Sequence, residues 1–422
     1  MKTFGLLCVI LAIGVSGAFT AERTVCFHLQ FADSRYNSPD STEVGARRPR
    51  SATFSDAVGH QIELWDKDQN SDDDYIGTWY ISAGGTQCVT FEWENSPASK
   101  GEPNPDVYLR YINTVNRTGF TNYITVKAVT TDGSDHPVTS WRNGPPGEPD
   151  RYVARNIVVG TTGFILPSGS LVPTTDPASS RALRIMALDS AQHTLQILGE
   201  MMNRHVRLHY PGREKCTTSC TDDRENFHIY SSQGGDGILV GHELGHVIQI
   251  QRFGQDDLRD DVSKGGDGWA LTSDEFDSGA TQEGFASYVG IVSWYDPNRR
   301  DTVPRGWGLD FETATPHDST CSVNRGIPLQ VAKAFWDVDD WNDEAASAGL
   351  GEADDTLHYR TEDIIAGWDH FANGTGNRQN DESDRDGVNV RDYYENNRNW
   401  FTATGFFNTF VRHNCLQDQA ND

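Results

Sequence analysis

The segment GILVGHELGHVIQIQRFG, residues 237–254, carries the strongest structural signal in the sequence. Within it, His242, Glu243 and His246 form an HExxH motif in a stretch whose apolar residues recur with helical spacing. Residues four apart share one face of a helix, so both imidazoles can bind the same Zn²⁺ ion. Glu243 can then take a proton from a water molecule at the metal. The motif predicts a zinc site with two histidine ligands and Glu243 as general base. The alternative is an amphipathic helix with two histidines on its polar edge.

Two glycines, Gly241 and Gly245, lie inside the same predicted helix. Glycine destabilises a helix interior, so it usually has a packing or functional reason there. Its presence predicts that a substrate or a neighbouring helix approaches the backbone closely at these two positions.

A catalytic zinc site needs a third protein ligand and one open position. The metzincin pattern HExxHxxGxxH is excluded, because Gln249 and Arg252 stand at its Gly and His positions. However, HELGH at 242–246 followed by EGFASY at 283–288 resembles the gluzincin metallopeptidases, the thermolysin-like group. The resemblance covers roughly residues 180–300. It implies a zincin-like fold, a protein or peptide substrate, zinc as cofactor and Glu283 as the third ligand.

The sequence departs from that family in two places. Between His246 and Glu283 lie 36 residues, more than in thermolysin, and they include an acidic loop. Glu283 is favoured because it begins a helix-periodic run, but the loop offers other candidate ligands: Asp274, Glu275 and Asp277. Ser287 replaces an Asp that braces a ligand histidine in the family, and its hydroxyl would support the ring more weakly. The oxyanion-stabilising residue stays open among Tyr359, His358, Tyr393, Tyr394 and His317.

The first residues predict export. Residues 1–17 combine Lys2, an apolar run and a small-residue cleavage site, which is typical of a secretory signal peptide. The run is too short to span a membrane, and no later segment is long enough, so we expect a secreted protein with no transmembrane span.

The cysteine pattern agrees with an exported protein. Cys8 leaves with the leader, and an even number of cysteines remains, which favours disulfides over free thiols. A zinc knuckle at Cys216 and Cys220 is disfavoured, since no second pair of Cys or His residues stands at ligand spacing. Cys26 and Cys88, which both lie in the first β-rich region, are expected to form a disulfide. The disulfide candidates are Cys26, Cys88, Cys216, Cys220, Cys321 and Cys415.

Two patterns divide the chain. Alternating β-branched and aromatic residues predict strands at 24–31, 61–66, 77–82, 87–93, 106–112 and 123–129. After the Pro/Gly-rich stretch 141–150, helical periods predict helices at 179–203, 238–252, 279–294, 326–341, 361–373 and 389–411, with strands at 206–212 and 226–232. We therefore expect a multidomain protein. An all-β sandwich at 22–140 and a linker at 141–150 precede a mainly helical, α+β zincin-like domain at 151–422.

An acidic loop follows one predicted strand. The sequence IELWDKDQNSDDDYIG, 62–77, places Asp66, Asp68 and Asp74 within nine residues. It resembles the calcium loop of C-two modules and an acidic loop of transthyretin-like sandwiches. That resemblance implies a β-sandwich and a Ca²⁺ site. A solvated acidic turn is the alternative; an EF-hand is excluded, because Gly77 stands where its Glu is required.

Net charge narrows the range of partners. The 422 residues contain 35 Lys and Arg against 61 Asp and Glu, a formal charge of −26. Such a surface repels phosphate backbones, which argues against nucleic-acid binding. The sequence thus predicts a secreted zinc metallohydrolase, foremost a peptidase. The alternatives are a gluzincin-like hydrolase of a non-peptide substrate and an extracellular adhesion protein with a structural zinc.

Overall fold

The structure is a computed structural model in which part of the chain can be described. The described residues are 20–39, 42–48, 54–66, 72–94, 107–117, 124–141, 164–165, 178–198, 201–212, 218–253, 270–273, 275, 277–299, 302–311, 326–340, 359–369, 390–397, 400–401, 410 and 416.

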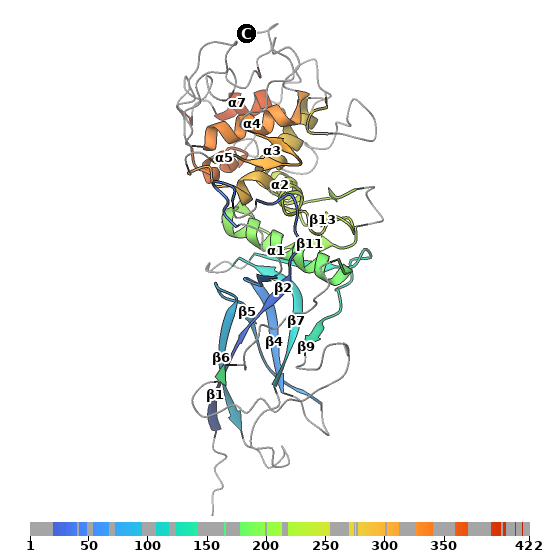
Figure 1. Cartoon of the computed structure of the whole chain (residues 1–422). Coiled ribbons are helices and arrows are strands. Elements are labelled where there is room, and N and C mark those ends of the chain that lie inside the picture. Colours follow the sequence, from blue (N-terminus) through green and yellow to red (C-terminus); the bar gives the residue numbers. More distant parts are fainter. Residues whose placement is uncertain are drawn as a thin grey trace, which may run out of the picture.

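The protein is a mixed α/β chain, with strands gathered at one end and helices at the other (Figure 1). The strands of the first half are β1 (Thr20–His28), β2 (Gln30–Ala32), β3 (Phe54–Asp56), β4 (His60–Asp66), β5 (Asp74–Tyr80), β6 (Thr86–Glu94), β7 (Val107–Asn116), β8 (Thr125–Val129) and β9 (Thr139–Trp141). Later strands are β10 (Phe164–Ile165), β11 (Val206–His209), β12 (Cys220–Thr221), β13 (Asn226–His228), β14 (Arg305–Gly306) and β15 (Leu309–Asp310). The helices are α1 (Ser180–Leu198), α2 (Gly237–Phe253), α3 (Asp277–Trp294), α4 (Pro328–Asp339), α5 (Thr361–Ala366) and α7 (Val390–Asn397).

Most predicted elements are confirmed. Each of the six expected strands of the first half overlaps an observed strand, and each expected helix overlaps an observed one. The largest differences are at helix C-termini. The helix expected at 389–411 stops at Asn397, that expected at 361–373 stops at Ala366, and that expected to reach residue 203 stops at Leu198. In α4, Pro328 occupies the first turn, where its missing N–H is not needed.

The main sheet contains strands from both before and after residues 141–150, the stretch that the sequence suggested as a linker. Its strand order is β12-β13-β11-β8-β7-β4-β5, with β9 pairing β7. The junction is the parallel pair β8–β11, in which Val126 lies opposite Val206. Strands from both sides of 141–150 therefore belong to one sheet, so the expected division into an all-β unit at 22–140 and a unit from 151 is not a division between sheets.

Helix α1 lies between the strands and the remaining helices (Figure 1). Its residues Ala182, Ile185 and Met186 enter a core shared with apolar side chains of β1, β4 and β7. Other residues of α1, such as Leu188 and Leu195, belong to the second core, which includes α2, α3 and α4. The helix thus buries apolar side chains on both sides, which joins the two halves of the molecule.

A buried ion network adds a polar connection across the same junction. Arg35, just after β2, donates to Asp33 at 3.0 Å and through Nη1 to Asp189 of α1 at 2.6 Å. All three side chains have 0% exposure. Arg48 also pairs with Asp189, at 2.8 Å. Because charges so deeply buried need partners, this network ties the N-terminal segment to α1.

The expected disulfide in the first β-rich region is present. Cys26 on β1 lies directly opposite Cys88 on β6, and the two are bonded with a Cα–Cα distance of 4.0 Å. Cys220 on β12 is also disulfide-bonded. Cys216, Cys321 and Cys415 lie outside the described residues, so the other pairings stay predictions.

Two features bear on the expected export. No helix among the described residues is long and apolar enough to cross a membrane. The proposed leader, residues 1–17, lies outside the described residues.

Candidate metal centre

Helix α2, which carries the HExxH motif, has a well-defined start. Asp236 precedes it, and its Oδ1 accepts the backbone N–H of Leu239 at 3.0 Å, an N-cap that satisfies a free donor of the first turn. Asn37 donates to the other carboxylate oxygen at 2.9 Å. Asn37 has a left-handed φ of 50°, which Asn tolerates better than most residues. The N-terminal segment therefore helps to position the motif helix.

The two glycines of α2 allow α3 to approach closely, as the sequence predicted. A Cβ at Gly245 would lie 2.8 Å from Cα of Ala286, and one at Gly241 would lie 3.0 Å from Cα of Gly290. Both clashes would be with backbone atoms, which cannot move aside. The glycines thus permit the helix spacing that brings Glu283 of α3 to the histidines of α2.

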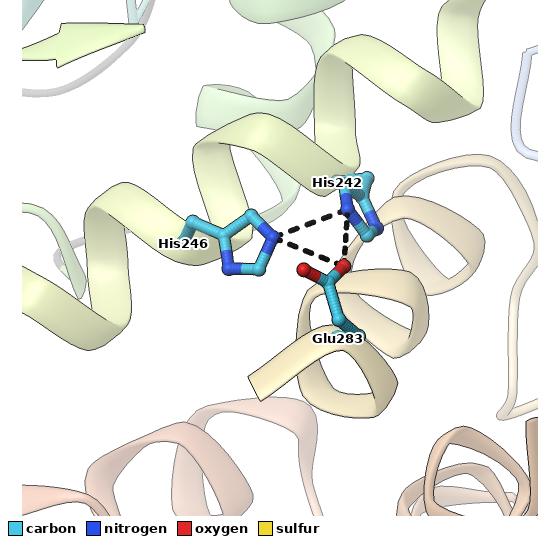
Figure 2. Close-up of side chains that lie close together, drawn as sticks. All are labelled: His242, His246 and Glu283. Carbon is cyan, nitrogen blue, oxygen red and sulfur yellow. Dashed lines mark hydrogen bonds and ion pairs between the residues drawn. The ribbon is translucent and has the colours of Figure 1, made fainter. Parts of the chain in front are cut away.

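Three side chains converge between these helices (Figure 2). Nε2 of His242 and Nε2 of His246 are 3.2 Å apart. Oε2 of Glu283 lies 3.1 Å from the first of these nitrogens and 3.4 Å from the second. They are the only group of three close His, Cys, Asp or Glu donors within the described part of the chain.

These distances fit a tetrahedral zinc ion. Ligand atoms about 2.05 Å from Zn²⁺ are about 3.3 Å apart at the tetrahedral angle, close to all three separations. Oε2 of Glu283 is also buried without a hydrogen bond of regular geometry, although both imidazole nitrogens are near. Two imidazoles and a carboxylate form a common ligand set of catalytic zinc. The donors therefore match this ion in type and spacing.

A neighbouring side chain contacts the Nδ1 atom of each histidine and so orients the ring. Nδ1 of His242 lies 3.2 Å from the buried hydroxyl of Ser287, the residue expected to support a ligand. Nδ1 of His246 lies 3.3 Å from Oε1 of Gln249, a contact that the sequence did not suggest. Such outer contacts select the ring orientation and leave Nε2 directed at the centre of the cluster.

The electrostatics of the cluster favour a cation at its centre. Burial alone would lower the pKa of His246, but the neighbouring Glu283 carboxylate raises it to about 9. Burial alone would raise the pKa of Glu283, but the two histidines lower it to about 2. The carboxylate that stabilises a proton on His246 would equally stabilise a divalent cation that displaces this proton, because an imidazole binds a metal only in its neutral form.

Glu243 does not belong to the group of three converging donors. It is 3% exposed, and burial raises the pKa of its carboxyl group. Its Oε2 accepts a hydrogen bond from Thr221 on β12 at 2.9 Å. A raised pKa lies closer to neutral pH, so the carboxyl group can both take a proton and return it.

A pocket of about 370 Å³ opens beside the cluster. His242, Glu243, His246 and Glu283 all line it, so the converging donors face open space. Its other lining residues come from the β12 region, the turn before α2, α2 itself and α3, and are Thr218, Ser219, Cys220, Thr221, Gln233, Leu239, Gln249, Ile250 and Gln282. A molecule larger than water can therefore reach the three donors and Glu243 together.

The other residues considered from sequence do not join this cluster where they can be described. Glu275 is buried, and its carboxylate accepts a hydrogen bond from Ser273. The hydroxyl of Tyr393 donates to the carbonyl of Ile364 at 2.6 Å within an aromatic core. Neither it nor Tyr359 or Tyr394 lines the pocket. Outside the described residues or side chains lie Asp274, Asp277, His317 and His358.

The predicted calcium loop is described only at its two ends. Asp66 and Asp74 lie directly opposite each other at the end of the β4–β5 pair where the loop joins the two strands. Asp66 is 3% exposed, whereas Asp74 is exposed. Asp68 lies outside the described residues, so the Ca²⁺ site stays a prediction.

Comparisons with known proteins identify no family. No protein-family model matches the chain, and no curated protein matches it. Among solved structures, a 9R-lipoxygenase from Cyanothece PCC8801 aligns at 15% identity with a TM-score of 0.20, covering 43% of this chain. The chain spans 23% of the length of that lipoxygenase, and a TM-score this low does not indicate a shared fold.

The geometry predicts which carboxylate controls metal affinity. Glu283→Ala removes one of three donors and should weaken zinc binding by more than the roughly 10- to 100-fold that loss of an outer partner of a ligand costs. Asp277→Ala should leave zinc binding unchanged. Competition with a chelator of known affinity measures both. Zinc binding lost in Asp277→Ala and retained in Glu283→Ala would move the third ligand into the acidic loop.

Proposed function

We propose that this protein is a secreted zinc-dependent hydrolase that cleaves peptide bonds. His242, His246 and Glu283 would hold the metal, and Glu243 would be the general base. The observation that carries the proposal is the convergence of the three donor atoms at 3.1, 3.2 and 3.4 Å beside a pocket that Glu243 also lines. The HExxH and EGFASY motifs and the leader-like sequence of residues 1–17 support it further.

A catalytic role is favoured over a structural one by the donor count and the pocket. A structural zinc is normally enclosed by four protein ligands, whereas a catalytic zinc has three and an open position. The cluster has three donors within the described residues, and they face the pocket. Open space at the donors has no use in a purely structural site.

The chain's own residues supply positioning and proton transfer. Bound zinc would supply Lewis acidity, which makes water a better nucleophile and polarises the carbonyl of a substrate. Glu243 faces the same pocket, where its carboxylate can remove the proton of the attacking water. The same carboxyl group can then deliver the proton to the leaving amine, and its raised pKa assists that return.

The direct experiment combines metal analysis with cleavage profiling of the purified full chain. We expect about one zinc per chain and cleavage within a mixed peptide library. Chelation should abolish cleavage, and added zinc should restore it. The library products also show whether ends or interior bonds are cut.

Two results would contradict the proposal in different ways. Stoichiometric zinc without cleavage of peptides, esters or amides would indicate a structural metal, as in an adhesion protein. Zinc-dependent cleavage of non-peptide substrates alone would preserve the hydrolase but exclude the peptidase.

A further inference from the structure

The side chain of Thr221 contacts Glu243 twice. Its Oγ1 lies 2.9 Å from Oε2 of Glu243 and 2.8 Å from the backbone carbonyl oxygen of the same residue. Thr221 belongs to β12, whereas Glu243 lies on α2, so the contact joins two elements that are separate in the chain. Oε1 of Glu243 accepts no hydrogen bond from any residue that the structure describes.

The strand that carries Thr221 is held from several directions. Thr221 pairs with Phe227 of β13, whose side chain is fully buried. The preceding residue, Cys220, is disulfide-bonded. Next along the chain, the backbone N–H of Asp222 donates to the carbonyl of Asn226 at 3.1 Å. The hydroxyl of Thr221 is therefore presented from a fixed backbone, as a positioning contact requires.

We propose that Thr221 is a positioning residue that holds Oε2 of Glu243 and so directs Oε1 toward the reacting water. This inference rests on the proposed hydrolase function and adds a residue to the same site. A glutamate has three rotatable side-chain bonds, and fixing one carboxylate oxygen removes most of that freedom before the reaction. Thr221 itself need not touch the metal or the substrate.

The contact to Oε2 can persist through proton transfer. While Glu243 is a carboxylate, Thr221 donates its single hydroxyl proton to Oε2. Once Oε1 has taken a proton from water, Oε2 is the carbonyl oxygen of the acid and still accepts the same hydrogen bond. When Oε1 passes its proton to the leaving amine, the carboxylate is restored, and no atom is gained or lost by Thr221. The Thr221 oxygen also lies 2.8 Å from the Glu243 backbone carbonyl oxygen, a second contact between β12 and α2.

The test compares Thr221→Val, which keeps the shape of the side chain but removes the hydroxyl, with Thr221→Ser, which keeps the hydroxyl. Loss of a hydrogen bond to a charged group should lower kcat about 10- to 100-fold in the Val variant. Its KM and zinc content should stay close to those of the unaltered protein, and its melting temperature should fall no further than loss of one hydrogen bond to a buried carboxylate requires. The Ser variant should recover most of kcat.

Thr361→Val is the matched control. Thr361 also donates to a buried carboxylate, that of Asp339, at 2.6 Å, but it lies outside the pocket. Its replacement should lower the melting temperature and leave kcat unchanged. This control separates the loss of any buried hydroxyl from the loss of the one on Glu243.

Three outcomes would overturn the role of Thr221: unchanged kcat in Thr221→Val, zinc loss in that variant, or no recovery in Thr221→Ser. Should the Val variant fail to fold, Thr221→Ala replaces it under the same criteria. An active unaltered protein with an equally active Val variant overturns only this inference. An unaltered protein that binds zinc but hydrolyses nothing overturns the proposed function, and the role of Thr221 with it.

Discussion

Glu243→Gln is expected to abolish most hydrolytic activity while the zinc content stays at the level of the unaltered protein. Glu243 does not belong to the converging donor group, which consists of His242, His246 and Glu283. The amide has nearly the same shape as the carboxylate and can still accept from Thr221, but it cannot take a proton from water. General-base catalysis of this kind contributes about 10²- to 10⁴-fold, so kcat should fall by that factor.

His246→Ala provides the contrast for this prediction, because it removes a metal donor and should lower zinc content and activity together. The measurements are zinc content by elemental analysis and initial cleavage rates of one library-derived peptide. Were Glu243→Gln to retain most of its activity at full zinc content, the assignment of Glu243 as the base would be wrong.

Arg35→Met is expected to produce the largest loss of stability away from the metal centre. Arg35 is the cation that lies between the carboxylates of Asp33 and Asp189, and all three side chains have 0% exposure. Removing it leaves Asp189 with Arg48 but leaves Asp33 without a cationic partner among the described residues. Breaking a buried pair in this way costs about 3–5 kcal/mol, because one buried charge is no longer compensated.

The effect is measured as the change in unfolding free energy of the full chain in urea. Arg360→Met is the matched control, because Arg360 pairs with Asp363 and Glu362 on the surface, and its loss should leave the transition unchanged. A second variant, Arg35→Met with Asp33→Asn, should recover part of the loss by removing the uncompensated charge. An unfolding curve of Arg35→Met that overlaps that of the unaltered protein would show that the network is dispensable.

Most helices and strands were predictable, because the patterns of apolar residues that indicate them lie within short stretches of sequence. Alternating apolar residues indicate strands, and apolar residues three and four apart indicate helices. Both patterns involve residues that are close in the sequence, and the structure contains the elements that they predict. The two histidines of HExxH are four residues apart on one helix, so helical geometry alone brings them together. Glycine at 241 and 245 also indicated close helix packing correctly, because the missing Cβ is itself the signal.

The relation between the two halves was not predictable in the same way. A Pro/Gly-rich stretch at 141–150 suggests a domain boundary, yet β8 and β11 on either side of it are paired in one sheet. Parallel pairing depends on strands that are distant in sequence, and composition carries little information about such pairs. Likewise, nothing local shows that Arg35 will lie between Asp33 and Asp189.

The sequence by itself determined the chemistry that the site can perform: two imidazoles at helical spacing, a carboxylate beside them, and a glutamate on a later helix as the expected third donor. The tertiary structure decided which distant groups complete it. Packing of α3 against the glycines of α2 brings Glu283 and Ser287 to the histidines, and β12 brings Thr221 to Glu243. The reason is that donor type is a property of each residue, whereas a separation of about 3 Å between elements far apart in sequence is set only by the packing of the whole chain.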